Sequence, residues 1–138
     1  GAGRPVLPVS DLAAVAAGCH REAGAPFVLA CLDARMGEVY WAAFDCRHGV
    51  PALLGEEHLD PPARVSLPPG GPWHGAGHGF AAWPDIAARL SIARVEADRL
   101  PRAADIARIA AADLMAGRGV AAEKALPVYL RDDVVHRR

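Results

Sequence analysis

Two apolar segments on either side of a short polar stretch constrain the fold of this 138-residue chain most strongly. Residues 27–32 read Phe-Val-Leu-Ala-Cys-Leu, and residues 39–44 read Val-Tyr-Trp-Ala-Ala-Phe. Residues 33–38 between them carry three charges and a glycine. Short apolar runs joined by a glycine-containing loop are typical of a β-hairpin. We therefore predict two antiparallel strands here, with Gly37 at the positive φ that a tight loop often needs.

The expected register of this hairpin follows from a four-residue loop at residues 34–37. It pairs side chains that suit one another across an antiparallel ladder: Asp33 with Glu38, Cys31 with Tyr40, and Phe27 with Phe44. Residues 50–59 can return as a third antiparallel strand, which the following prolines would end.

Strand and helix patterns alternate through the rest of the chain. Ser10 is expected to cap a helix with one apolar face, and Gly24 to end it. Further strands are expected at residues 5–9, 73–79 and 92–95, and a short helix at residues 86–90. This order predicts an α/β fold with a mixed sheet flanked by helices.

The longest helix is expected after Pro101, a first-turn proline that helices tolerate. Asp105 and Arg108 can pair at i, i+3, and Gly117 would end the helix. Its apolar stripe is expected to consist of Ile106, Ile109, Ala110 and Leu114.

Composition excludes some classes of function. A net charge of −1 provides no basic field for grasping nucleic acid. The absence of Thr, Asn and Gln makes a base-specific pocket hard to build. No apolar segment approaches the roughly 20 residues that span a bilayer, so no membrane association is expected. Three cysteines without CxxC spacing indicate free thiols in a reducing cytosol.

A glycine-rich segment follows the loop around residue 70. Gly75, Gly77 and Gly79 could bring backbone N–H groups close to a phosphate, or could simply form a tight turn between strand and helix. His74 and His78 have the spacing of a helical zinc pair, but the intervening glycines argue against a helix. We expect no metal and no other cofactor, and leave both interpretations of the glycines open.

The sequence assembles no obvious nucleophile. Ser10 is better explained as a helix cap, and Ser66 and Ser91 lie outside any Gly-x-Ser-x-Gly elbow. Cys31 alternates along a strand and is expected to be a small buried hydrophobe. Hydrolytic catalysis by this chain is therefore not expected.

The densest polar cluster lies in residues 33–40. It can be a contact surface for a partner, or a salt-bridge network that fixes the loop, and the residues alone support both interpretations equally. In the loop-fixing interpretation, Arg35 pairs with Asp33 or Glu38.

The same cluster resembles the signature of the glycoprotease-like TsaB family, which covers residues 28–41. Residues 8–12, 77–85 and 127–131 agree with further family stretches in order and spacing. The family-motif positions, which the resemblance makes candidates for partner binding, are Asp33, Arg35, Gly37, Glu38, Tyr40, Tyr129 and Arg131.

The resemblance implies the second lobe of an ASKHA fold, the architecture of actin, sugar kinases and Hsp70. Residues 1–24 would end the first lobe, and residues 25–138 would form the second. It also implies a non-catalytic cytoplasmic scaffold, which works with TsaD and the ATPase TsaE to transfer threonylcarbamoyl to the tRNA adenosine beside the anticodon. The scaffold would meet tRNA only through that complex. The alternatives are a glycoprotease-like hydrolase and a residual nucleotide-binding lobe.

The family's Gly-Pro-Gly-Ser-Phe-Thr-Gly segment has no counterpart in the chain, which is therefore expected to be a C-terminal portion. The strand at residues 5–9 would then lack its neighbours. Unpaired strand edges seek partners, so we expect either disorder before Ser10 or self-association through these residues.

Overall fold

The computed structural model describes residues 9–115. Most of the strand expected at residues 5–9, the helix end at Gly117, and the motif positions Tyr129 and Arg131 lie outside the described residues. The described elements are α1 (Asp11–Ala23), β1 (Phe27–Asp33), β2 (Val39–Asp45), β3 (Ala52–Asp60), the 3-10 turn η1 (Pro62–Arg64), β4 (Trp73–Ala76), α2 (Gly79–Ala82), α3 (Asp85–Leu90), β5 (Arg94–Glu96) and α4 (Ala103–Met115).

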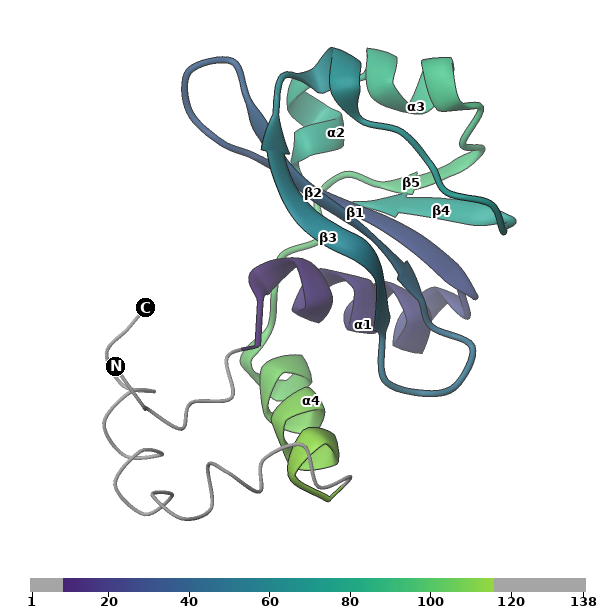
Figure 1. Cartoon of the computed structure of the whole chain (residues 1–138), viewed down its shortest axis with the longest axis vertical. Coiled ribbons are helices and arrows are strands. Elements are labelled where there is room, and N and C mark those ends of the chain that lie inside the picture. The colour runs from purple at the N-terminus through teal and green to yellow at the C-terminus, as the bar shows by residue number, and fades with distance from the viewer. Residues whose placement is uncertain (1–8, 116–138) are drawn as a thin grey trace.

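The five strands form one mixed sheet in the order β3-β2-β1-β4-β5. β1, β2 and β3 are antiparallel neighbours, while β4 pairs parallel with both β1 and β5. Helix α1 covers one face of the sheet, and α2 and α3 cover the other (Figure 1). The predicted α/β architecture with a mixed sheet is confirmed, although α2 was not predicted.

Helix α1 forms as the sequence predicts. The Ser10 hydroxyl accepts a hydrogen bond from the Ala13 amide at 2.9 Å, and Gly24 ends the helix with a φ of 70°. Its buried face includes Leu12, Val15 and Cys19, which pack on the sheet in one apolar cluster. Because this cluster also contains residues of β1, β2 and β4, α1 is part of the same hydrophobic core as the sheet.

The hairpin of β1 and β2 is confirmed, but the predicted register is wrong by one residue. Asp33 lies opposite Val39, not Glu38, and Cys31 lies opposite Trp41, not Tyr40. The predicted pair of Phe27 and Phe44 is likewise replaced by Phe27 and Asp45. The loop spans residues 34–38 and closes with a hydrogen bond from the Ala34 amide to the Glu38 carbonyl at 2.8 Å.

The burial of aromatic side chains explains this register. Trp41 shares the sheet face of Cys31 and packs in the cluster beneath α2 and α3, whereas Tyr40 on the opposite face is 49% exposed. A slip of one residue would move every side chain of β2 to the other face. In the predicted register, Trp41 would lie on the face of the sheet that α1 covers. Tyr40 would take its place beneath α2 and α3.

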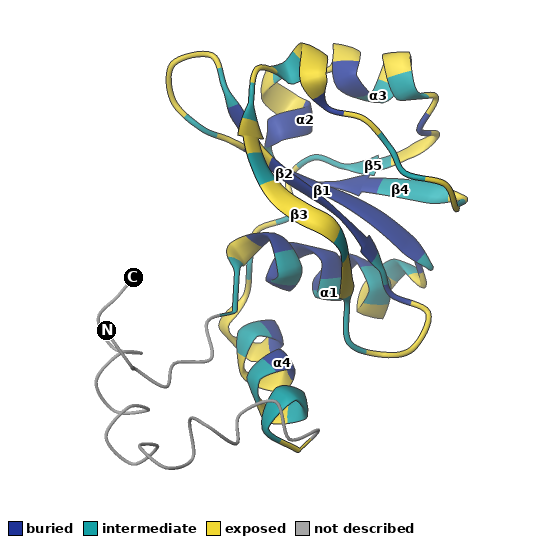
Figure 2. Ribbon diagram, in the orientation of Figure 1, coloured by how far each residue is buried: buried dark blue, intermediate teal, exposed yellow. Residues whose placement is uncertain are grey.

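The third antiparallel strand is confirmed as β3, which lies at the sheet edge and is largely exposed (Figure 2). A register shift interrupts its pairing with β2 between Trp41 and Ala43. The Trp41 indole donates to Asp60 Oδ2 at 3.0 Å and stacks on His58. These contacts fix the end of β3 beside the tip of the hairpin.

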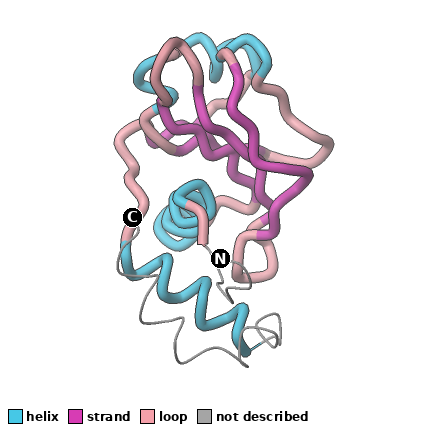
Figure 3. Tube along the Cα trace, turned by 60° about the vertical axis from the view of Figure 1, so that its left-hand side comes forward, coloured by secondary structure: helices cyan, strands magenta, loops and turns pink. Residues whose placement is uncertain are grey.

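Helix α4 packs on α1, which lies between it and the sheet (Figure 3). Of the predicted apolar stripe only Ile109 is buried, at 7% exposure, while Ile106, Ala110 and Leu114 are half-buried. The predicted pair of Asp105 and Arg108 forms at 2.9 Å. Among residues 9–115, no helix has the length and apolar character needed to cross a membrane.

Candidate functional site

The hairpin tip, defined here as residues 33–40, projects from the sheet beside the end of β3. It borders an open depression of about 460 Å³. The depression is lined by Asp33, Ala34, Arg35, Met36, Glu38, Tyr40 and Leu59. All five predicted motif positions of this region, including Gly37 with its φ of 77°, therefore lie together at one end of the sheet.

Asp33 connects the hairpin tip to the segment around α2. Its carboxylate oxygen Oδ1 accepts from Trp83 Nε1 at 3.2 Å, and its backbone amide donates to His78 Nδ1 at 3.0 Å. Sequence reasoning missed both contacts because the partners are 50 and 45 residues away. The one sequence signal for such a contact was Trp83, since a buried indole N–H usually finds an acceptor.

The predicted ion pair of Arg35 with Asp33 or Glu38 is wrong. Arg35 is exposed, and within residues 9–115 its side chain makes no hydrogen bond or ion pair. The backbone hydrogen bond between Ala34 and Glu38 already closes the loop. An exposed ion pair would add little free energy and would restrict two long side chains.

Replacement of Arg35 by alanine is therefore expected to change the free energy of unfolding by less than about 0.5 kcal/mol. Urea denaturation followed by circular dichroism measures this. Arg47→Ala is the matched control for the removal of an arginine that does make contacts. Arg47 pairs with Asp45 at 2.8 Å and lies over the Phe27 ring. A loss above about 1 kcal/mol for Arg35→Ala would restore the loop-fixing role.

The three candidate glycines of the turn before α2 lie where side chains would collide. A Cβ at Gly75 would be 2.7 Å from the Phe80 ring, and one at Gly79 would be 2.5 Å from Cys31 Sγ. A Cβ at Gly77, whose φ is 113°, would overlap the Cys31 carbonyl oxygen. Close packing of β4 and α2 on β1 accounts for these glycines. Phosphate binding by the same turn stays a prediction.

The two histidines of this segment, His74 and His78, lie in different environments. His78 Nδ1 is occupied by the Asp33 amide. Both ring nitrogens of His74 are buried without a hydrogen-bond partner in the described structure, and burial lowers the pKa of this imidazole. Within residues 9–115, no three His, Cys, Asp or Glu side chains are grouped to hold a metal ion.

The three cysteines are unpaired and buried, as predicted for free thiols. Burial raises the pKa of Cys19, Cys31 and Cys46 to about 12 in each case. The thiols are therefore protonated at neutral pH. A protonated, buried thiol is a poor nucleophile, because the thiolate is the reactive form.

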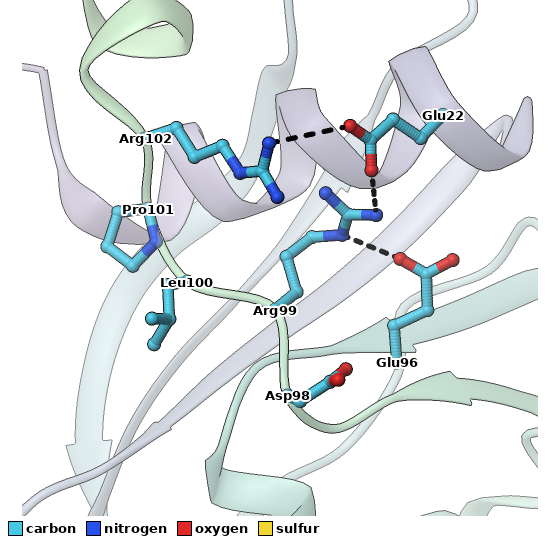
Figure 4. A pocket seen from close by; sticks show the side chains of 7 residues that line it. All are labelled: Glu22, Glu96, Asp98, Arg99, Leu100, Pro101 and Arg102. Atoms are coloured by element: carbon cyan, nitrogen blue, oxygen red, sulfur yellow. Dashed lines mark hydrogen bonds and ion pairs between the residues drawn. The ribbon is translucent and has the colours of Figure 1, made fainter.

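A second polar cluster joins α1, the end of β5 and the segment that leads into α4. Arg99 reaches between two carboxylates, donating to Glu96 at 2.6 Å and to Glu22 at 2.7 Å (Figure 4). It lines a pocket of about 420 Å³ with Leu100 and Arg102. Glu96 is only three residues from Arg99, but Glu22 is 77 residues away, and this separation hid the cluster from sequence reasoning.

Asp105 lies at the centre of the contact between α1 and α4. Its side chain is 1% exposed and accepts from Arg21 Nε at 3.1 Å and Nη2 at 2.8 Å, in addition to Arg108. Gly18 on α1 leaves the space for this approach, because a Cβ there would be 3.1 Å from Asp105 Oδ2 and 2.9 Å from Arg99 Nη1.

Comparison with known proteins gives this arrangement its context. A family model for TsaD, tRNA N6-adenosine threonylcarbamoyltransferase, matches residues 1–137. The chain belongs to this family. It is 37% identical over 146 residues to the tRNA threonylcarbamoyladenosine biosynthesis protein TsaB of Escherichia coli (strain K12). That similarity covers 100% of this chain and confirms the predicted resemblance to TsaB.

Two solved structures from Pseudomonas aeruginosa share the fold. One is YeaZ, and the other is described as an uncharacterized protein with similarity to peptidase YeaZ. Each is 40% identical with a TM-score of 0.73, and the matches cover 88% and 87% of this chain. They confirm the predicted ASKHA-like fold. The chain spans 62% of the E. coli protein's length, and 57% and 56% of the two P. aeruginosa chains.

Proposed function

We propose that the protein is a non-catalytic subunit of the machinery that makes threonylcarbamoyladenosine in tRNA. The observation that carries the proposal is the similarity to E. coli TsaB, which extends over the whole chain. In this proposal the subunit acts in the cytoplasm beside a TsaD transferase and a TsaE ATPase. Residues 1–24 would end its first lobe, and residues 25–138 would form its second.

The chemistry of the described residues supports a scaffold more than a catalyst. The three thiols are held in the protonated form by burial. The Ser10 hydroxyl caps α1. His78 is committed to a backbone amide, so its Nδ1 is not available as a general base.

The overall charge of the chain supports contact with tRNA only through another subunit. The chain carries 15 Lys and Arg residues against 16 Asp and Glu residues. Binding to nucleic acid is dominated by cationic contacts to phosphates, which this balance does not favour. Another subunit would then supply most of the contacts to the RNA backbone.

Deletion of the gene is expected to lower the threonylcarbamoyladenosine content of bulk tRNA, measured by mass spectrometry of digested nucleosides. The complete gene should restore it, and so should a Cys31→Ala variant, because the scaffold has no use for that thiol. The melting temperature of the variant shows whether it is folded.

Two results would contradict the proposal. An unchanged nucleoside content after deletion would remove the protein from this pathway. A folded Cys31→Ala variant that fails to restore the modification, together with peptide hydrolysis by the wild-type protein alone, would favour the glycoprotease-like alternative.

A further inference from the structure

His74 on β4 is a buried titratable side chain that the proposed function does not use. Its two ring nitrogens are shielded from solvent, and neither has a hydrogen-bond partner among the described residues. Burying a charge without a partner costs far more free energy than burying a neutral polar group. The site therefore favours the neutral imidazole, and burial lowers the pKa of His74.

The sheet register places His74 beside the charges of β5. His74 lies opposite Arg94, and Ala76 lies opposite Glu96, so these four side chains point to one face of the sheet. Ala76 belongs to the core cluster of α1, which identifies this face as the one that α1 covers. The charge of Arg94 opposes protonation of the imidazole, whereas the charge of Glu96 favours it. Glu96 is therefore the acceptor within reach of a protonated His74.

The other elements that pack closely on β4 are β1 and α1. β1 places the apolar side chain of Val28 opposite His74. The C-terminal part of α1 carries four ionisable side chains, which are Cys19, His20, Arg21 and Glu22. The first three provide no anion, since burial keeps the Cys19 thiol protonated. The carboxylate of Glu22 already accepts from Arg21 and Arg99.

Glu96 is itself engaged with another cation. Arg99 Nε donates to its carboxylate at 2.6 Å, and Arg99 Nη2 donates to Glu22 of α1 at 2.7 Å (Figure 4). The Arg99 side chain is only 10% exposed and lies in the segment that connects β5 to α4. The pair of Glu96 and Arg99 therefore ties this connecting segment to the edge of the sheet.

We propose that His74 is a pH sensor that competes with Arg99 for Glu96. At neutral pH the imidazole is uncharged, and Glu96 holds Arg99. When His74 takes a proton from solvent, the imidazolium donates to Glu96, and Arg99 keeps only Glu22. The segment between β5 and α4 then loosens, and α4 separates more readily from α1. The switch is independent of the proposed function.

Acid should weaken the fold through His74. Because its pKa is lowered in the folded protein, the unfolded chain takes up the proton at a higher pH than the folded protein does. The stability linked to His74 is therefore complete above the unfolded-state pKa, which is about 6.5 for histidine. It declines as the pH falls below that value.

Hydrogen exchange followed by mass spectrometry tests the switch on the protein expressed from its complete gene, at about pH 7.5 and about pH 5.5. After correction for intrinsic exchange rates, the amides of β5 and α4 should open about threefold or more often at the lower pH. His74→Gln cannot take up the proton and should abolish this increase. His74→Leu should do the same, which guards against a packing defect of the glutamine. His48→Gln is the matched control, because His48 is exposed, and it should keep the full increase.

An NMR titration of the imidazole tests whether Glu96 is the acceptor, with the His74 signal assigned from its loss in His74→Gln. Glu96→Gln removes the anion, so the titration midpoint of His74 should fall by about 0.5 pH unit or more. Asp98→Asn is the control, because Asp98 is exposed in the same segment, and the midpoint should stay unchanged.

Three results would overturn the switch. One is an unchanged His74 midpoint in Glu96→Gln. Another is an acid-induced increase in exchange that persists in both His74 variants. The third is an increase confined to β4 and β5, because burial of His74 would then act locally without releasing α4. None of these measurements depends on the tRNA modification, so failure of the switch and failure of the proposed function are distinguishable.

Discussion

Replacement of Gly77 by alanine is expected to lower the free energy of unfolding by about 3–5 kcal/mol. Two costs add at this position. The φ of 113° is a conformation that residues with a Cβ rarely adopt, and the added methyl group would overlap the Cys31 carbonyl oxygen. That carbonyl belongs to the central strand β1 and cannot move without disturbing the sheet. Urea denaturation with fluorescence and circular dichroism measures the loss.

Gly37→Ala is the matched control for Gly77→Ala. Gly37 also has a positive φ, at 77°, but nothing lies within 4 Å of the position that a Cβ would take. The control should therefore cost only about 1–2 kcal/mol, from backbone conformation alone. Equal and small losses for the two variants would show that the turn before α2 is loosely packed. That result would favour the phosphate-binding interpretation of these glycines.

Replacement of Asp105 by alanine is expected to lower the free energy of unfolding by about 2–4 kcal/mol and to loosen α4 from α1. The carboxylate is buried and accepts hydrogen bonds from Arg21 and Arg108. Its removal leaves Arg108 without this acceptor and leaves Arg21 with only Glu22, at 3.1 Å. Both guanidinium groups can partly return to water, because they are 37% and 57% exposed. Hydrogen exchange should become faster in α4 than in the strands. Asp98→Ala is the control: Asp98 is exposed and lines the neighbouring pocket of Arg99, so its loss should change stability by less than about 0.5 kcal/mol.

The contribution of Asp105 should also depend on pH. Burial raises the pKa of this carboxyl, but the hydrogen bonds and charges of Arg21 and Arg108 outweigh burial and hold the pKa below its ordinary value. A carboxylate with a lowered pKa stabilises the fold above the unfolded-state value, which is about 3.9 for aspartate. This stabilisation is lost as the pH falls through the folded-state pKa. The difference in stability between wild type and Asp105→Ala should therefore shrink as the pH falls below about 4. A constant difference down to pH 2 would contradict this assignment.

Local sequence patterns determined most of the secondary structure. Ser10 and Gly24 bound α1 because capping depends on side chains and φ angles within a few residues. The hairpin, the third strand and the helix after Pro101 were likewise predictable, because hydrophobic periodicity and turn residues act over short distances. The motif positions within residues 33–40 lie together because one β-hairpin carries them all.

Tertiary contacts decided what the sequence could not. The hairpin register depended on which face of the sheet has room for Trp41, and that space is built by α2 and α3 from more than 30 residues away. Asp33 accepts a hydrogen bond from Trp83 and makes no ion pair with Arg35. An indole N–H at the edge of the core needs an acceptor more than an exposed guanidinium does.

The two positions that matter most for stability show the same division. The sequence marked Gly77 as a turn residue, but only the fold brings the Cys31 carbonyl against it. It marked Asp105 as a partner of Arg108 one helical turn away, but only the packing of α4 on α1 buries the carboxylate and adds Arg21 from 84 residues away. Sequence alone determined the local conformations. The tertiary structure decided which side chains are desolvated together, because burial depends on residues that are distant in the chain and close in space.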